Sequence, residues 1–276
     1  MVSLLLDCHE LAAQLATAEP PVVLDVRWAL GGPSGVSDYT KGHIPSAHFV
    51  DLDRELSAPP GLGRHPLPDA AGFAAAMRRH GVDGSRLVVA YDAATGTSAA
   101  RAWWLLRYFG HPKVALLDGG YAAWVAAGLP VEEGVDRDPG VGDFEATPGG
   151  MPLLDAEGAR AMAHDAVLID ARAPERFRGE TEPVDPVAGH IPGARNLPAQ
   201  RTQHSDGTFL SPDGLRARYA AVGVAPGDPV GVYCGSGVVA TEGVFAMGLA
   251  GVDAALYAGS WSDWITDPNR PIEVGG

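Results

Sequence analysis

The sequence is poor in cysteine. Only Cys8 and Cys234 occur among its 276 residues. Two cysteines cannot build the disulfide framework of a small secreted protein or a four-cysteine zinc site. We therefore expect a protein of a reducing compartment, with the cytoplasm as its default location, and we expect neither a metal nor another cofactor.

Long apolar runs and an excess of basic residues are also missing. Without an apolar run of about 18 residues we expect no transmembrane helix, and residues 1–7 lack the basic region of a signal peptide. The formal net charge of −14 argues against a nucleic acid or an anionic membrane as partner. An anionic substrate would need a local positive site that works against this overall charge.

The chain does contain an internal repeat of alternating strands and helices. An apolar run ending in Asp-x-Arg occurs at 22–27 and at 166–172, and a Gly-His-Ile-Pro turn follows at 42–47 and at 189–194. Further predicted pairs are the helices 69–80 and 211–221, the strands 87–91 and 229–233, the helices 98–109 and 240–250, and the segments 115–124 and 255–264. Such alternation predicts an α/β fold of two tandem domains, each a parallel sheet with helices on both faces.

Between the two halves, residues 131–152 are rich in Gly, Pro, Asp and Glu and show no apolar period. This composition is typical of a linker. We therefore predict a first domain at 1–130, a linker at 131–152 and a second domain at 153–276.

The most informative stretch is 230–240, which reads as a strand, a glycine-bearing loop with Cys234 at its start, and the beginning of a helix. Loop N–H groups and the positive end of the helix dipole favour a thiolate there, and the thiolate is the reactive form of cysteine. A buried structural cysteine is the alternative. The first half carries Asp92 at the matching place, so the scaffold does not need a cysteine, and the repeat favours chemistry at Cys234.

Taken together, the duplicated Asp-x-Arg strand, the Gly-His-Ile-Pro turn, the cysteine loop and the Gly259-Ser260-Trp261 helix resemble the two-domain rhodanese family of sulfurtransferases. The resemblance implies two rhodanese-like domains, of which the first is inactive because Asp92 replaces the cysteine. The loop 234–238 is similar to that of members using 3-mercaptopyruvate, whereas animal thiosulfate sulfurtransferases carry basic residues where Gly235 and Ser236 stand.

The resemblance also implies a mechanism and its residues. Cys234 would take sulfur from a small anionic donor, 3-mercaptopyruvate, as a persulfide and pass it to a thiol such as thioredoxin, or to cyanide. Ser236 would relay a proton, with His65 polarising Ser236 and Asp53 orienting His65. The remaining loop residues expected to contact the donor are Gly235, Gly237, Val238 and Val239.

Arginine is the expected ligand of the donor carboxylate, because its guanidinium fork matches a carboxylate. Arg176 matches the family arginine, and Arg178 is a nearby substitute. The second arginine that many family members carry before the Gly-His-Ile-Pro turn is missing from residues 182–187, and Val239 stands where a threonine is usual. These departures keep thiosulfate open as the alternative donor.

Two other functions compete with sulfur transfer. A cysteine phosphatase of the same fold needs an arginine six residues after the cysteine, and Ala240 stands there. A non-catalytic sulfur carrier or binding module is disfavoured because the loop keeps its nucleophile.

Overall fold

The computed structural model describes residues 4–135 and 140–276, which fold into two compact units. The first unit contains Met1–Ala58, Pro68–Met151 and Ser205–Thr208, and the second contains Pro59–Leu67, Pro152–His204 and Phe209–Gly276. Two short segments thus belong to the unit opposite the one that their sequence position suggests. The sequence predicted no such exchange, and it matters because Pro59–Leu67 carries His65.

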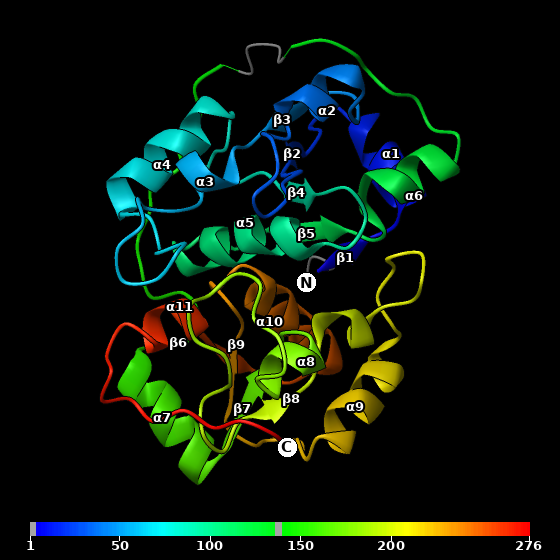
Figure 1. Cartoon of the computed structure of the whole chain (residues 1–276). Coiled ribbons are helices and arrows are strands. Elements are labelled where there is room, and N and C mark those ends of the chain that lie inside the picture. The colour runs from blue at the N-terminus through cyan, green and yellow to red at the C-terminus, as the bar shows by residue number, and fades with distance from the viewer. Residues whose placement is uncertain (1–3, 136–139) are drawn as a thin grey trace. The chain divides into compact units, whose positions relative to one another are not determined.

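A five-stranded parallel sheet forms the centre of the first unit (Figure 1). Its spatial order is β1-β5-β4-β2-β3. The strands are β1 (Leu5–Leu6), β2 (Val22–Asp25), β3 (Ala47–Phe49), β4 (Val88–Tyr91) and β5 (Val114–Leu117). The helices are α1 (Cys8–Leu15), α2 (Val36–Lys41), α3 (Leu52–Glu55), α4 (Ala70–Arg79), α5 (Thr97–Tyr108) and α6 (Gly120–Ala126). Every residue of β2, β4 and β5 is buried, as expected for parallel strands covered on both faces.

The second unit repeats this sheet in the order β6-β10-β9-β7-β8. Its strands are β6 (Leu153–Leu154), β7 (Val167–Asp170), β8 (Arg195–Asn196), β9 (Val230–Tyr233) and β10 (Ala254–Tyr257). Its helices are α7 (Ala156–Asp165), α8 (Pro174–Phe177), the 3₁₀ helix η1 (Ala199–Thr202), α9 (Pro212–Ala221), α10 (Val239–Ala250) and α11 (Ser260–Trp264). The predicted α/β fold of two tandem parallel sheets is confirmed.

Each sheet is covered by apolar side chains from helices far apart in sequence. In the first unit, Leu11 of α1 and Trp124 of α6 are buried in one core cluster with residues of β2, β4 and β5. In the second unit, Trp261 and Trp264 of α11 pack with Tyr233 at the end of β9. The tryptophans of α11 therefore fix this helix against the strand that precedes Cys234.

The Asp-x-Arg motif joins a strand end to the Gly-His-Ile-Pro turn in each unit. Arg172 donates through Nε and Nη2 to the Asp170 carboxylate, and its Nη2 also donates to the carbonyl oxygen of Gly189 at 2.7 Å. Arg27 makes the same bonds to Asp25 and to a glycine carbonyl. The repeated geometry identifies these buried ion pairs as structural parts of the fold.

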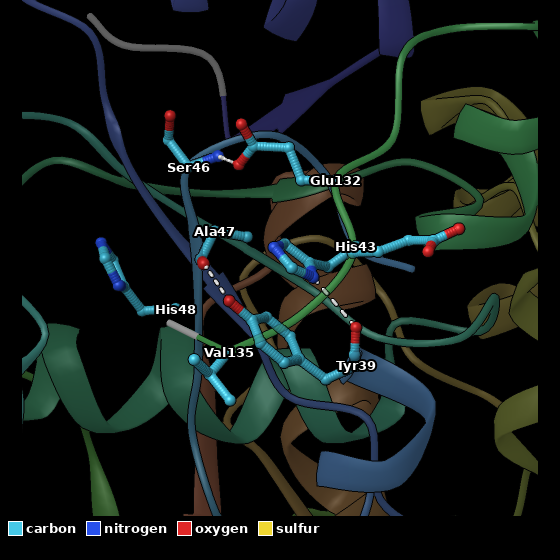
Figure 2. Close-up of a pocket in the computed structure, with 8 residues that line it drawn as sticks. Tyr39, His43, Ser46, Ala47, His48, Glu132 and Val135 are labelled. Atoms are coloured by element: carbon cyan, nitrogen blue, oxygen red, sulfur yellow. Dashed lines mark hydrogen bonds between the residues drawn. The ribbon is translucent and has the colours of Figure 1, made fainter. Parts of the chain in front are cut away.

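The histidines of the two turns are also structural. Figure 2 shows His43 beside Tyr39, whose ring it stacks on at 3.9 Å between centroids. His43 Nδ1 lies 2.9 Å from the Tyr39 carbonyl oxygen, and the Tyr39 hydroxyl donates to the Ala47 carbonyl. His190 repeats this pattern with Phe177. Its ring stacks on the Phe177 ring, and its Nδ1 lies 2.7 Å from the Phe177 carbonyl oxygen.

The segment 131–152, predicted as a linker, packs along the first unit. Phe144 is buried against Phe73, and Gly142 N–H donates to the Arg78 carbonyl oxygen. Within its described part, the only regular pairing is a single β-bridge between Glu132 and His43. Across the described residues, every helix is too short or too polar to cross a lipid bilayer.

Candidate active site

Cys234 lies directly after β9, at the carboxyl edge of the second sheet, and α10 begins five residues later. The start of α11 fixes the loop. Cys234 N–H donates to Ser260 Oγ at 3.0 Å, Trp261 N–H donates to the Cys234 carbonyl at 3.0 Å, and Ser262 N–H donates to the Gly235 carbonyl at 2.9 Å. The backbone on both sides of the cysteine is therefore held by a neighbouring helix.

The sulfur of Cys234 faces hydrogen-bond donors. Gly237 N–H donates to Sγ at 3.2 Å, the Ser260 hydroxyl lies 4.0 Å from Sγ, and Cys234 is only 1% exposed. Gly237 has φ of +78°, and a Cβ added there would lie 2.2 Å from the Ala258 carbonyl oxygen. Only glycine fits this position, and the resulting turn aims an N–H at the sulfur. Together with the N-terminus of α10, these donors stabilise a negative sulfur atom.

The structure brings two of the predicted relay residues together. His65 Nδ1 lies 2.8 Å from Ser236 Oγ, and both side chains are buried within the second unit. The segment of His65 is fixed next to α11, because Arg64 N–H donates to Ser262 Oγ at 3.1 Å. A serine hydroxyl two residues after the cysteine is thus bonded to an imidazole, a pair able to move a proton.

Asp53 belongs to the first unit, where its Oδ2 accepts a hydrogen bond from Trp28 Nε1 at 3.0 Å. His65 belongs to the second unit. The orienting role of Asp53 on His65 stays a prediction.

Arg176 reaches the cysteine loop from the last turn of α8. Its Nε and Nη2 donate to the Glu182 carboxylate at 3.1 and 2.7 Å, and Nη2 also donates to Asp185 at 3.2 Å. A Cβ added to Gly235 would lie 3.5 Å from Arg176 Nη2, so the guanidinium adjoins the loop. Arg178 instead pairs through Nε and Nη2 with Glu180, which is exposed. Arg176 is therefore the arginine of the two that suits a ligand at the loop.

Arg64 is a residue that sequence reasoning missed. Its Nη1 donates to Asp185, and its Nη2 would lie 2.8 Å from a Cβ added to Gly235. Arg64, Arg176, Glu182 and Asp185 form what we call the arginine cluster. Burial raises the pKa of Asp185, and the Glu182 charge acts in the same direction against the two guanidiniums. Burial also opposes ionisation of Glu182, but hydrogen bonds, above all from Arg176, lower its pKa.

The other predicted loop residues lie at the start of α10. Val238 is its N-cap and is 1% exposed, and Val239 is its first residue. Gly235 lies between the cysteine and the arginine cluster, and a side chain at this position would meet both guanidiniums. The two guanidiniums therefore lie against the loop at the residue that directly follows the cysteine.

The equivalent loop of the first unit holds an anion of its own. Oδ1 of Asp92 accepts N–H bonds from Ala94 and Gly96 at 3.1 and 2.9 Å. Oδ2 accepts from the N–H and hydroxyl of Ser98 at 2.9 and 3.1 Å, and from Ala99 N–H at 3.4 Å. Burial nevertheless raises the pKa of Asp92 against these hydrogen bonds. The strand-loop-helix scaffold thus binds a negative group when a side chain supplies one.

A cavity of the first unit is poorly suited to an anionic donor. A space of about 250 Å³ in the first unit lies beside His43, Glu132 and Glu133 (Figure 2). Its lining includes two carboxylates and no lysine or arginine, so it does not suit an anionic donor. Among the described residues, no group of three or more His, Cys, Asp or Glu side chains could hold a metal ion.

Comparison with known proteins agrees with the duplicated fold. The family described as "Rhodanese-like domain" matches twice, at residues 7–127 and 155–267. The "Probable 3-mercaptopyruvate sulfurtransferase" of Pseudomonas aeruginosa is 49% identical over 281 residues, which cover 98% of each chain. The "Putative thiosulfate sulfurtransferase SseB" of Mycobacterium tuberculosis is 44% identical over 276 residues, covering 98% of this chain and 97% of the other. The crystal structure of SseA from Escherichia coli, a 3-mercaptopyruvate sulfotransferase, aligns with a TM-score of 0.84 at 34% identity, covering 94% of this chain and 99% of that one.

Proposed function

The chain belongs to the rhodanese-like family of sulfurtransferases, and we propose that it takes sulfur from 3-mercaptopyruvate and passes it to a thiol or to cyanide through a persulfide on Cys234. The observation that carries this proposal is the set of groups that surround Cys234. Its sulfur accepts the Gly237 N–H, and its loop lies beside both a bonded Ser236–His65 pair and two guanidiniums. The relative from Pseudomonas aeruginosa, named for this donor at 49% identity, supports the same choice.

In the first half-reaction the Cys234 thiolate attacks the donor sulfur. The new S–S bond forms as the donor C–S bond breaks, and the bonding electrons pass to the methylene carbon as an enolate of pyruvate. The Gly237 N–H that donates to Sγ, together with the Ser260 hydroxyl, stabilises the negative sulfur before and after transfer. Dividing the transfer through a covalent intermediate lowers the barrier of each step.

The enolate needs a proton to become pyruvate. The donor S–H proton leaves through Ser236 Oγ and reaches the methylene carbon, so that the persulfide remains as an anion. His65, at 2.8 Å, holds the hydroxyl and takes up or returns its proton during the relay. Arg176 beside Gly235 binds the donor carboxylate in this scheme.

In the second half-reaction an acceptor attacks the outer sulfur of the persulfide. The S–S bond breaks, Cys234 leaves as the thiolate, and the acceptor carries the sulfur away as a new persulfide or as thiocyanate. A dithiol protein such as thioredoxin is the proposed cellular acceptor, and the cytoplasm is the proposed location.

Thiosulfate is the second candidate donor, and one observation favours it. A relative at 44% identity carries that substrate in its name. The first unit takes no sulfur in either case, because Asp92 is a poor sulfur nucleophile and already fills its own loop.

The proposal is tested with the purified protein, cyanide and each donor in turn. We expect pyruvate and thiocyanate to appear together with 3-mercaptopyruvate, and kcat/KM to exceed that for thiosulfate. Without acceptor, the mass of the intact protein should rise by one sulfur atom, and Cys234→Ser should abolish both signals. Absence of thiocyanate with either donor, or full activity of Cys234→Ser, would refute the proposal.

A further inference from the structure

Two serines of the chain occupy a backbone conformation that glycine normally takes. Among the described non-glycine residues, only Ser46 and Ser260 have a positive φ, of 65° and 54°. Each stands where the other half of the repeat carries a glycine, Gly193 for Ser46 and Gly120 for Ser260, with φ of 82° and 56°. This left-handed region strains a serine but not a glycine, by about 5- to 30-fold in the unfolding equilibrium. Such strain at one copy of a repeat points to a role for the side chain.

The turn that contains Ser260 has the same backbone geometry in both units. In each, the N–H that follows this position donates to the carbonyl oxygen of the residue directly after β9 or β4, Cys234 at 3.0 Å or Asp92 at 2.9 Å. In the first unit a side chain would not fit, because a Cβ added to Gly120 would lie 2.6 Å from the Asp92 carbonyl oxygen. The fold therefore needs the left-handed turn twice, and the serine occurs at this turn only in the unit that contains the cysteine.

The Ser260 hydroxyl lies beside both the backbone and the sulfur of Cys234. Its side chain is buried, and Oγ accepts the Cys234 N–H at 3.0 Å and donates to the Tyr257 carbonyl oxygen at 2.9 Å. The same oxygen lies 4.0 Å from Sγ. Ser46, by contrast, is exposed and belongs to the first unit. Of the two strained serines, it is Ser260 that places a hydroxyl at the nucleophile.

This hydroxyl can respond to charge on the sulfur. A serine hydroxyl has one proton, which turns about the Cβ–Oγ bond toward its best acceptor. In the structure that acceptor is the Tyr257 carbonyl oxygen. A negative sulfur is a stronger acceptor than a neutral carbonyl, because its hydrogen bond is charge-assisted. The proton can therefore turn from Tyr257 to Cys234 Sγ when the sulfur becomes negative, while Oγ still accepts the Cys234 N–H.

We propose that Ser260 is a positioning residue for Cys234, and that the chain carries a strained serine here because its hydroxyl acts on the cysteine. The oxygen fixes the backbone of Cys234, and the turning proton stabilises the sulfur whenever it is negative in the two half-reactions. This inference rests on the proposed function of Cys234. The competing explanation is a structural serine, whose hydrogen bonds only tie the start of α11 to the cysteine loop.

Two substitutions at Ser260 and one control separate strain from chemistry. Ser260→Gly removes both the hydroxyl and the strain, whereas Ser260→Ala removes the hydroxyl and keeps the strain. In urea titrations, the unfolding constant of Ser260→Ala should therefore be about 5- to 30-fold above that of Ser260→Gly. Ser46→Gly is the matched control, because it relieves the same strain in the first unit. It should lower the unfolding constant by a similar factor and leave kcat unchanged.

Activity should depend on the hydroxyl and not on the stability. We expect both Ser260 variants to lower kcat about 10- to 100-fold, equally for 3-mercaptopyruvate and thiosulfate, the effect of losing a hydrogen bond to a charged group. KM should stay within about threefold of the parent, because Ser260 acts on the nucleophile and not on the donor. Parental kcat in Ser260→Gly, or kcat values that differ between the two variants as their stabilities do, would make the serine structural and overturn the inference.

Alkylation of Cys234 gives a test that needs no sulfur donor. Iodoacetamide forms an S–C bond with the thiolate and releases iodide, and mass spectrometry of the Cys234 peptide follows the rate. At about pH 7 we expect this rate to fall about 10-fold in both Ser260 variants and to stay parental in Ser46→Gly. An unchanged rate in the two Ser260 variants would overturn the inference. Failure of the proposed function looks different, because the parent protein would then turn over neither donor although its Cys234 is alkylated.

Discussion

Two glycines at the two ends of α10 provide a matched test of the cysteine loop. Gly237 precedes the helix with φ of +78°, and Gly251 follows it with φ of +80°. An alanine at either position has to adopt a left-handed conformation, which costs about 1–2 kcal/mol. At Gly251 the added Cβ meets nothing within 4 Å, whereas at Gly237 it lies 2.2 Å from the backbone oxygen of Ala258.

The two substitutions should therefore differ in stability and more strongly in activity. We expect Gly251→Ala to lower the free energy of unfolding by about 1–2 kcal/mol, and Gly237→Ala by about 2–5 kcal/mol, because a backbone atom cannot rotate out of the way. Displacing Gly237 also withdraws the N–H that donates to Cys234 Sγ, so kcat should fall about 100-fold.

Denaturant unfolding and the pyruvate assay measure these two effects on the same preparations. Gly251→Ala must keep near-parental kcat for the comparison to isolate the loop. If Gly237→Ala matched Gly251→Ala in both stability and kcat, the loop would not owe its function to a backbone donor at the sulfur.

Three further substitutions test separate parts of the second unit. Ser236→Ala should lower kcat for 3-mercaptopyruvate about 100-fold but change thiosulfate turnover little, since only the first donor needs a proton on carbon; equal losses in coupled assays would contradict the relay. Hydrogen bonds, above all from Arg176, lower the pKa of Glu182 in the folded protein. Its ionised form therefore stabilises the fold at pH values above the ordinary glutamate pKa of about 4.3, and this stabilisation is lost as the pH falls. The stability advantage of the parent over Glu182→Gln should accordingly shrink between about pH 5 and pH 3 in urea titrations, and a constant difference would argue against it. Arg172→Met leaves the Asp170 carboxylate buried without its partner and should destabilise the protein by about 3–5 kcal/mol; a loss below about 1 kcal/mol would refute the structural role of the pair.

Strands with long apolar runs were predictable, and short elements were not. Val167–Asp170 and Val230–Tyr233 are continuous buried runs with an aspartate or a cysteine at their ends, a pattern that the sequence displays directly. The edge strands Leu5–Leu6 and Leu153–Leu154 were missed because two residues show no period, and their strand character comes from pairing with β5 and β10. Helix α3 was not predictable either, because a helix of four residues gives no amphipathic signal.

The site was predictable where it follows the local sequence, and not where it depends on tertiary contacts. Cys234 was found from its strand-loop-helix setting, and the Ser236–His65 pair from a family resemblance. Arg176 and Arg178 are two residues apart, and only the structure distinguishes the one beside Gly235 from the one paired with Glu180. Arg64 gave no signal, because its place depends on the packing of Pro59–Leu67 against α11, some 200 residues later in the chain.

The inactive loop indicates where the outer sulfur of the persulfide should bind. Helices α5 and α10 begin five residues after Asp92 and after Cys234, so the two loops are equal in length. In the loop of the first unit, the carboxylate oxygens of Asp92 extend beyond the end of β4 and accept hydrogen bonds from the N–H groups of Gly96 and Ser98. A cysteine side chain is one atom shorter, and its Sγ accepts only the Gly237 N–H of the described loop backbone. The outer sulfur of a persulfide adds the one atom by which the cysteine side chain is shorter than the aspartate side chain.

We therefore expect the outer sulfur to accept the N–H groups of Val238 and Ala240, which follow Cys234 by four and six residues, as Gly96 and Ser98 follow Asp92. These two amides lie at the N-terminus of α10, where the first N–H groups of a helix have no partner within the helix and the dipole favours negative charge. A crystal structure of the protein loaded with sulfur checks this directly, by the distances from the outer sulfur to the two amide nitrogens. If the outer sulfur pointed away from both amides, the loop of the second unit would not bind its anion in the way that the loop of the first unit binds the Asp92 carboxylate.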